Sequence, residues 1–396
     1  MISLTQSTRY GRREFLRVGG LGLGGLSLAS LFPRGVAGAE REKPITDKAV
    51  VFIFLHGGPS QFETFDPKMT APAEIRCANG EIKTAIPGIT FGKHFPKLAK
   101  MADRLAIVRS YVPGDANHDI KPVVGKNSFG ANLGAAYATV AGGTDLSGMP
   151  TNCLLFPRAV DPKAEPGQAG FGKFASTGPF AASSSPFQPD GDGGLKNDMK
   201  LNLPLDRLDD RRALLAGFDQ LRRGMEDETL ALEETRQRAY SLLLSGVGDA
   251  FDLTKEGAKT VEKYDTAKLG IAEKINQKWN NRKFYRDNAN TLGKLLLLAR
   301  RLVERGAGFV TVTTNFVWDM HADVNNAPVT EGMDYNGPPL DHALSVFLDD
   351  LRDRGLEDRV LVVACGEMGR TPRINKNVGR DHWGNLGPLL LAGGGL

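Results

Sequence analysis

The chain has 396 residues, of which 41% are hydrophobic and 24% are charged. This usage is close to that of average globular proteins, and it excludes a disordered protein, a collagen-like chain and a polytopic membrane protein. The net charge of +4 arises within residues 1–39, which hold five arginines and one glutamate. Without that segment the acidic and basic side chains are equal in number, so the charge gives no reason to expect nucleic acid or an anionic membrane as a partner.

Residues 1–39 have the pattern of an export signal. A charged stretch, GRREFLR at 11–17, precedes a weakly apolar, glycine-rich run, and Ala37-Gly38-Ala39 has the form of a cleavage site. The paired arginines in the charged stretch resemble a twin-arginine export signal. The glycines oppose a stable helix, and the apolar run is shorter than a membrane span requires. We therefore predict a cleaved signal peptide, a periplasmic or secreted protein and no stable membrane span in the mature chain, with an uncleaved anchor as the alternative.

Strands and helices are predicted to alternate along residues 40–396. The continuous apolar run at 49–55 is typical of a strand that is buried on both faces, as in parallel sheets. After that strand, the pattern predicts a short helix over 95–102, a strand over 105–108 and long loops over 110–200. Several helices follow within 205–304, and the last of them spans 288–304. The C-terminal part is predicted to form a strand over 308–314, a helix over 340–354, and strands over 359–364 and 387–392. This alternation indicates one α/β domain with a mostly parallel central sheet flanked by helices and a helical insertion.

Side chains suited to catalysis follow several of the predicted strands. In open parallel sheets, ligands bind beyond the carboxyl ends of the strands. Four of the six histidines follow a predicted strand, at positions 56, 118, 321 and 382. Because imidazoles and carboxylates from several strand ends can converge on one or two divalent ions, the sequence predicts a metal site there. His56 and His118 are candidates for ligands or for acid–base groups.

Each of these residues also has a plainer interpretation. His56 begins a His-Gly-Gly-Pro-Ser turn, and it is as readily a turn histidine as a ligand. Asp319 and His321 are two residues apart, so they would face one side of an extended segment, either as a ligand pair or as ordinary loop residues. Asp381 and His382 form a dipeptide that also occurs by chance.

Glu367 and Arg370 are harder to explain as ordinary loop residues. Glu367 follows a strongly apolar strand and would lie at the mouth of the sheet. Arg370 is placed either to clamp an anionic substrate or to pair with Glu367. No P-loop, dinucleotide fingerprint, zinc-finger or G-x-S-x-G pattern is present, so no such motif competes with the metal-site interpretation.

Several motifs together carry a resemblance to a known family. They are FLHGGPSQ at 54–61, FDPK at 65–68, VRS at 108–110, LLARRLVE at 297–304, WDMH at 318–321, GEMGRTP at 366–372 and GRDHW at 379–383. With these motifs in this order, the chain resembles family 1501 of domains of unknown function, a branch of the alkaline phosphatase and sulfatase superfamily. The resemblance implies a central sheet flanked by helices, a two-metal site at the strand ends, and phosphate or sulfate esters as substrates.

The resemblance also implies roles for individual residues. Asp319 and His321 look like the Asp and His that bind one metal after a middle strand. Glu367 stands where superfamily members carry an Asp-His metal pair after the next strand. His382 looks like the distal metal-binding His, and Asp381 would join it.

Two departures from the superfamily pattern concern the reaction itself. The metal-binding Asp expected at the end of the first strand is replaced by His56. The position of the usual hydroxyl or thiol nucleophile falls within DANHD at 115–119, which contains neither group. Ser60 and Ser110 are candidate substitutes outside that position. The chain also stops at Leu396, just after a predicted strand where superfamily members continue, so we expect a truncated domain.

The sequence as a whole predicts an exported, metal-dependent hydrolase. Its substrate would be a small-molecule or polysaccharide phosphate or sulfate ester, and its divalent metal would be zinc, or else calcium or manganese. Asp319, His321, Glu367, Asp381, His382 and His56 are the candidate metal ligands, and His118, Ser60 and Arg370 are the candidate catalytic residues. The alternative is a non-catalytic exported binding or cell-surface protein that kept the fold. A periplasmic oxidoreductase is a third hypothesis, supported by the leader alone.

Overall fold

The structure is a computed structural model that describes residues 47–143, 148–189 and 247–396. The predicted signal peptide and the first part of the 205–304 segment lie outside the described residues.

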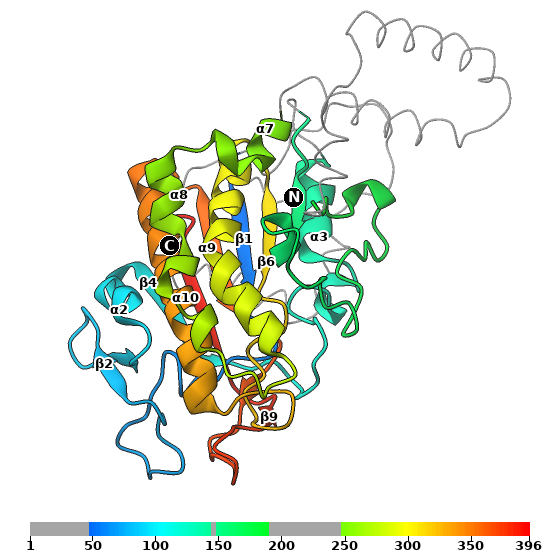
Figure 1. Ribbon diagram of the computed structural model, residues 1–396. Helices are drawn as coiled ribbons and strands as arrows, with labels where there is room; N and C mark the ends of the chain where they lie inside the picture. The colour runs from blue at the N-terminus through cyan, green and yellow to red at the C-terminus, as the bar shows by residue number, and fades with distance from the viewer. Residues whose placement is uncertain (1–46, 144–147, 190–246) are drawn as a thin grey trace, which may run out of the picture. The chain divides into compact units, whose positions relative to one another are not determined.

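A six-stranded sheet forms the centre of the described part of the chain (Figure 1). Its strands lie in the order β4 (Leu105–Tyr111), β10 (Gly387–Gly393), β7 (Val360–Cys365), β1 (Ala49–Phe54), β6 (Phe309–Thr313) and β5 (Asn152–Leu155). β1 pairs in parallel with both β6 and β7, and β5 pairs in parallel with β6. Only β10, between β4 and β7, runs antiparallel to its neighbours. The predicted mixed α/β fold with a mostly parallel central sheet is therefore confirmed.

The sequence of β1, AVVFIF, explains its central place in the sheet. Val51 and Ile53 point into the larger hydrophobic core, whereas Phe52 and Phe54 point into the smaller core on the opposite face. Successive side chains of a strand face opposite sides, so a strand with a core on each face needs an unbroken apolar run.

Two long helices cover the face with the larger core. α9 (Arg282–Glu304) and α10 (Val329–Asp353) pack against each other, as Figure 1 shows. The opposite face is covered by α3 (Leu133–Ala141) and by loops that carry phenylalanines. Among the described residues, the remaining α-helices are α2 (Pro96–Lys100), α7 (Gly248–Phe251) and α8 (Ala258–Tyr264). The remaining strands form two ribbons, β2 (Glu81–Lys83) with β3 (Thr90–Gly92) and β8 (Gly369–Arg370) with β9 (His382–Trp383). Short 3-10 helices connect several of these elements.

Several elements differ from the sequence prediction: α9 begins at Arg282 and not at residue 288, and the two short ribbons were not predicted. α3 and β5 lie within the segment 110–200, where long loops were expected, and both are too short to show a clear period. α10 begins at Val329 and not at residue 340, because it continues through Pro338 and Pro339. Prolines normally end a helix, but here the residues before them are buried in the core, and this packing outweighs the lost hydrogen bonds.

A buried carboxylate joins α10 to α2. Asp341, which is 3% exposed, accepts hydrogen bonds from the backbone N–H groups of Lys97 (3.0 Å) and Leu98 (2.8 Å) in the first turn of α2. Burial raises the pKa of Asp341 to about 6, although these bonds and two nearby lysines oppose the shift. The folded protein therefore binds a proton at this site more tightly than the unfolded chain does.

Asp341→Asn is predicted to change how stability depends on pH. Because the pKa of Asp341 is raised on folding, its contribution to stability is largest near pH 4 and is lost as the pH rises through about 6. The free energy of unfolding of the parent, relative to that of the variant, should fall by up to about 2–3 kcal/mol between pH 4 and 7. Urea unfolding at several pH values measures this difference. Asp353→Asn, at an exposed carboxylate of the same helix, is the control, and parallel pH curves for parent and Asp341→Asn would contradict the prediction.

Candidate functional site

Five segments of the chain bring polar side chains to one edge of the sheet. His56 follows β1, Asp319 follows β6, Glu367 follows β7 and His118 follows β4. His382 comes before β10, and because β10 is antiparallel, its first residues lie at the same edge. The strand-end argument from the sequence therefore selected the correct edge for all five residues.

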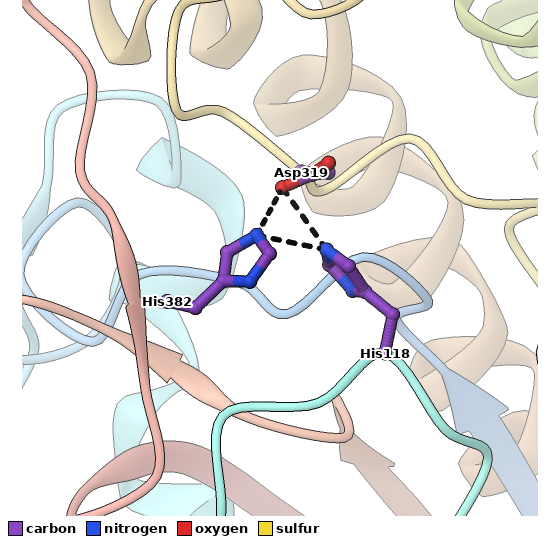
Figure 2. Close-up of side chains that lie close together, drawn as sticks. All are labelled: His118, Asp319 and His382. Atoms are coloured by element: carbon purple, nitrogen blue, oxygen red, sulfur yellow. Dashed lines mark hydrogen bonds and ion pairs between the residues drawn. The ribbon is translucent and has the colours of Figure 1, made fainter.

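Three of these side chains form a tight cluster, which we call the His118–Asp319–His382 cluster (Figure 2). The Nε2 atoms of His118 and His382 face each other at 2.9 Å. Each of them also lies close to Asp319 Oδ1, at 3.3 Å for His118 and 3.2 Å for His382. One ligand atom from each residue lies within 4.8 Å of the other two.

Two further nitrogens approach the same carboxylate oxygen. His321 Nδ1 lies 2.9 Å and Arg370 Nη2 lies 2.7 Å from Asp319 Oδ1. Four nitrogens thus surround one oxygen, which has only about two lone-pair positions for hydrogen bonds. Among the described residues, His321 Nδ1 is buried and makes no hydrogen bond with suitable geometry. The crowding at Asp319 Oδ1 thus leaves this nitrogen without a well-oriented acceptor in that part of the chain.

The separations within the cluster fit a small transition-metal ion. Ligand atoms held tetrahedrally at about 2.0–2.1 Å from zinc lie roughly 3.3–3.4 Å apart. The three distances in the cluster, 2.9, 3.2 and 3.3 Å, are close to that value. Imidazole nitrogens suit zinc and iron, whereas calcium prefers oxygen ligands throughout, so the donor set favours zinc over calcium.

Glu367 lies behind His118, outside the cluster. Its Oε1 is 2.8 Å from Nδ1 of His118, the ring nitrogen opposite the one in the cluster. The backbone N–H of Gly57 donates to both carboxylate oxygens, at 2.9 and 3.1 Å. Glu367 is completely buried.

All three nitrogens of the buried Arg370 guanidinium contact oxygen atoms of the protein. Its Nη2 pairs with Asp319, its Nε donates to the carbonyl of Gly58 at 2.8 Å, and its Nη1 donates to the carbonyl of Arg380 at 3.2 Å. Nη2 also contacts the carbonyl oxygen of Gly57. Arg370 therefore pairs with Asp319 and not with Glu367, and its buried guanidinium holds Asp319 in place.

His56 is enclosed by aromatic rings. Its ring centroid lies 5.0–6.1 Å from those of four phenylalanines, at positions 54, 171, 174 and 316. Neither ring nitrogen has a hydrogen-bond partner among the described residues. Burial lowers the pKa of His56 to about 4, so the ring is neutral at physiological pH.

Ser60 and Asp381 make their contacts away from the cluster. The Ser60 hydroxyl accepts a long bond of 3.4 Å from the Glu63 N–H, within its own turn. The exposed Asp381 carboxylate accepts a hydrogen bond from Asn375 Nδ2 at 2.9 Å. In the described part of the chain, neither side chain bonds to His118, Asp319 or His382.

The surrounding charges set the ionisation of the cluster. Burial would raise the pKa of Asp319, but Arg370 and three imidazoles outweigh it and hold the pKa far below its usual range. Burial lowers the pKa of His118, but Asp319 and Glu367 outweigh this effect, and the net shift is upward. Asp319 is thus a permanent carboxylate, as a metal ligand must be.

Two supporting residues were not identified from the sequence. Asn326 Nδ2 donates to Asp319 Oδ2 at 2.9 Å, and it lies seven residues along the same loop. Arg380 pairs with Glu63 at 2.9 Å, and both side chains are completely buried. Arg380 immediately precedes Asp381 and His382 in GRDHW, so its place in that motif was the available signal.

One protein family matches the part of the chain that contains the site. The family described as "Protein of unknown function (DUF1501)" matches residues 47–396, which include every residue of the site. The chain belongs to the DUF1501 family. No curated protein and no solved structure matches it. The family match over residues 47–396 confirms the family that was predicted from the sequence motifs.

A glycine holds the site of this DUF1501 chain together. Gly57 has a φ of +109°, and a Cβ atom there would lie 2.5 Å from Asp319 N and 2.7 Å from Trp318 N. The turn after β1 and the loop after β6 can approach this closely only if the side chain is absent.

Gly57→Ala is predicted to destabilise the protein by about 3 kcal/mol or more, because it adds steric overlap with backbone to an unfavourable φ. Gly114→Ala is the matched control, since Gly114 has a similar φ of +104° but nothing within 4 Å of its Cβ position. The control should cost only about 1 kcal/mol. Chemical unfolding measures both, and equal losses would show that the close approach at Gly57 is unimportant.

Proposed function

We propose that this chain is an exported, metal-dependent hydrolase of phosphate or sulfate esters, related to the alkaline phosphatase and sulfatase superfamily. The observation that carries the proposal is the pair of Nε2 atoms of His118 and His382, which face each other at 2.9 Å beside the buried Asp319 carboxylate. Two ring nitrogens at this distance share either a hydrogen or a cation, and the buried carboxylate beside both of them supports a shared cation. The sequence motifs favour the superfamily, and they suggest the ester substrate.

The proposed roles follow from the contacts. His118, His382 and Asp319 bind the ion. His321, whose side chain is 26% exposed, lies beside Asp319 with Nδ1 2.9 Å from Oδ1 and helps to position that carboxylate. A divalent ion there would polarise an ester oxygen and lower the pKa of water. Arg370 and Asn326 hold the two oxygens of Asp319 in a fixed orientation. Since no hydroxyl or thiol of the described residues bonds to the cluster, the proposal makes water the attacking group.

Export is part of the proposal and is supported by the twin-arginine pattern of the leader. Among the helices of the described residues, none has both the length and the apolar character of a membrane span. We expect the mature protein, cleaved after Ala39, to be found in the periplasm or in the medium.

A non-catalytic exported binding protein is the second candidate function. One observation favours it: every nitrogen of the Arg370 guanidinium already contacts a carbonyl or carboxylate group. Arg370 is therefore not free to clamp an anionic ester, although the sequence suggested that role. Under this alternative the cluster would bind metal without turnover.

Metal content tests the proposed site directly. We predict close to one zinc ion per chain for the full-length protein purified from metal-replete cells, measured by mass spectrometry. His118→Ala and His382→Ala should each lower the zinc content at least about tenfold, because each removes a ligand. His342→Ala, which removes an imidazole near Lys97 on the surface of α10, should leave it unchanged. A parent protein without bound metal, or one whose zinc survives both ligand variants, would contradict the proposal.

Turnover distinguishes the two candidate functions. The hydrolase should cleave an aryl phosphate or an aryl sulfate, and a chelator or His382→Ala should abolish the rate. Zinc binding that depends on His118 and His382, combined with no cleavage of either ester, would favour the binding protein.

A further inference from the structure

Glu367 is buried, and among the described residues its carboxylate has hydrogen bonds with the backbone N–H of Gly57 and with His118. The sequence suggested a metal ligand at this position, but the carboxylate lies on the far side of the His118 ring from the cluster. Its Oε1 lies between two N–H donors, Gly57 N at 2.9 Å and His118 Nδ1 at 2.8 Å, while Oε2 accepts from Gly57 N at 3.1 Å. The carboxylate thus faces the Gly57 N–H and the His118 ring.

The contact with His118 determines which ring nitrogen carries the proton. A carboxylate accepts hydrogen bonds, so the short contact places the hydrogen on Nδ1 of His118. In the neutral ring this leaves the lone pair on Nε2, the atom that faces His382 and Asp319. A metal-binding imidazole needs its lone pair at that position.

The carboxylate is itself held rigidly. Gly57 N–H reaches both oxygens, and the side chain has no exposed surface. The same turn accepts hydrogen bonds from Arg370, the partner of Asp319. One turn therefore fixes the groups behind two of the three cluster residues.

We propose that Glu367 is a positioning residue that fixes the tautomer and orientation of His118, so that Nε2 is presented to the ion. This inference rests on the proposed function, because it assigns His118 as a ligand. It differs from the expectation of the sequence, in which Glu367 binds the metal itself. The two roles predict different effects when Glu367 is replaced.

Glu367→Gln and Glu367→Ala test the inference, with Asp341→Asn as the matched control. Asp341 is also a buried carboxylate that accepts backbone N–H bonds, but it lies between α2 and α10. Zinc affinity of the full-length protein is measured by competition with a chelator. The two Glu367 variants should bind zinc about 10–100-fold more weakly, as expected for the loss of an outer hydrogen-bond partner, while the control stays within about twofold.

The coordination itself separates positioning from ligation. With ¹¹³Cd and ¹⁵N-histidine, the parent should show coupling to Nε2 of His118, and X-ray absorption should count the same number of ligands in the parent and in Glu367→Gln. One oxygen ligand fewer in the variant, or unchanged affinity in both Glu367 variants, would overturn the inference. Circular dichroism checks folding, and if Glu367→Ala does not fold, Glu367→Gln decides.

The ring tautomer keeps this test independent of the proposed function. In the metal-free protein, the ¹⁵N resonances of neutral His118 should show hydrogen on Nδ1 in the parent, and that preference should be lost in Glu367→Ala. Zinc that does not bind to the parent would remove the proposed function, whatever the tautomer. Hydrogen on Nε2 in the metal-free parent would overturn the role of Glu367 even if zinc binds.

Discussion

The close approach of the turn after β1 to the loop after β6 is the constraint on which the site depends. At Gly57 a Cβ atom would lie 2.5 Å from the backbone nitrogen of Asp319, so the two segments touch without any side chain between them. The N–H of Gly57 holds Glu367, and its carbonyl contacts Arg370. The central strand thus contributes backbone groups to the site, and the neighbouring strands contribute the side chains.

Buried charge and backbone strain are concentrated around this contact. Burying an ion pair such as Asp319–Arg370 or Glu63–Arg380 costs several kcal/mol per ion in desolvation, so such pairs add little net stability. Four non-glycine residues with positive φ (Asn315, Phe316, Ala322 and Val378) lie in the loops that carry the ligands or contact them. Each costs about 1–3 kcal/mol. These features are understandable if they hold ligands in position, and packing alone does not require them.

The sequence was most informative where a physical rule connects residue order to space. The apolar run of β1 and the residues after each parallel strand located the correct edge of the sheet, because carboxyl ends of parallel strands lie together. It was least informative about what each polar group faces. Glu367 and Asp319 both follow buried strands, yet one contacts a backbone N–H and an imidazole, whereas the other contacts five nitrogens. That difference depends on side-chain direction and loop path, which no local pattern encodes. The start of α10 at Val329 could not be predicted either, because Pro338 and Pro339 normally end a helix and here packing keeps the helix continuous through them.

Under the proposed function, His56 stands where the superfamily pattern has an acid, and this accounts for one donor set among the described residues in place of two. Among the described residues, a single group of three metal-type side chains meets, and His56 is not part of it. A carboxylate after β1 would need charged or polar neighbours. His56 instead lies among phenyl rings, with Phe171 and Phe316 stacked at 4.5 Å beside it. The same two rings pack against His118, at 5.7 and 4.8 Å. Aromatic rings therefore form one side of the cluster. The proposed function therefore places one ion in the His118–Asp319–His382 cluster, between these aromatic rings and the polar loops that carry Asp319 and His382.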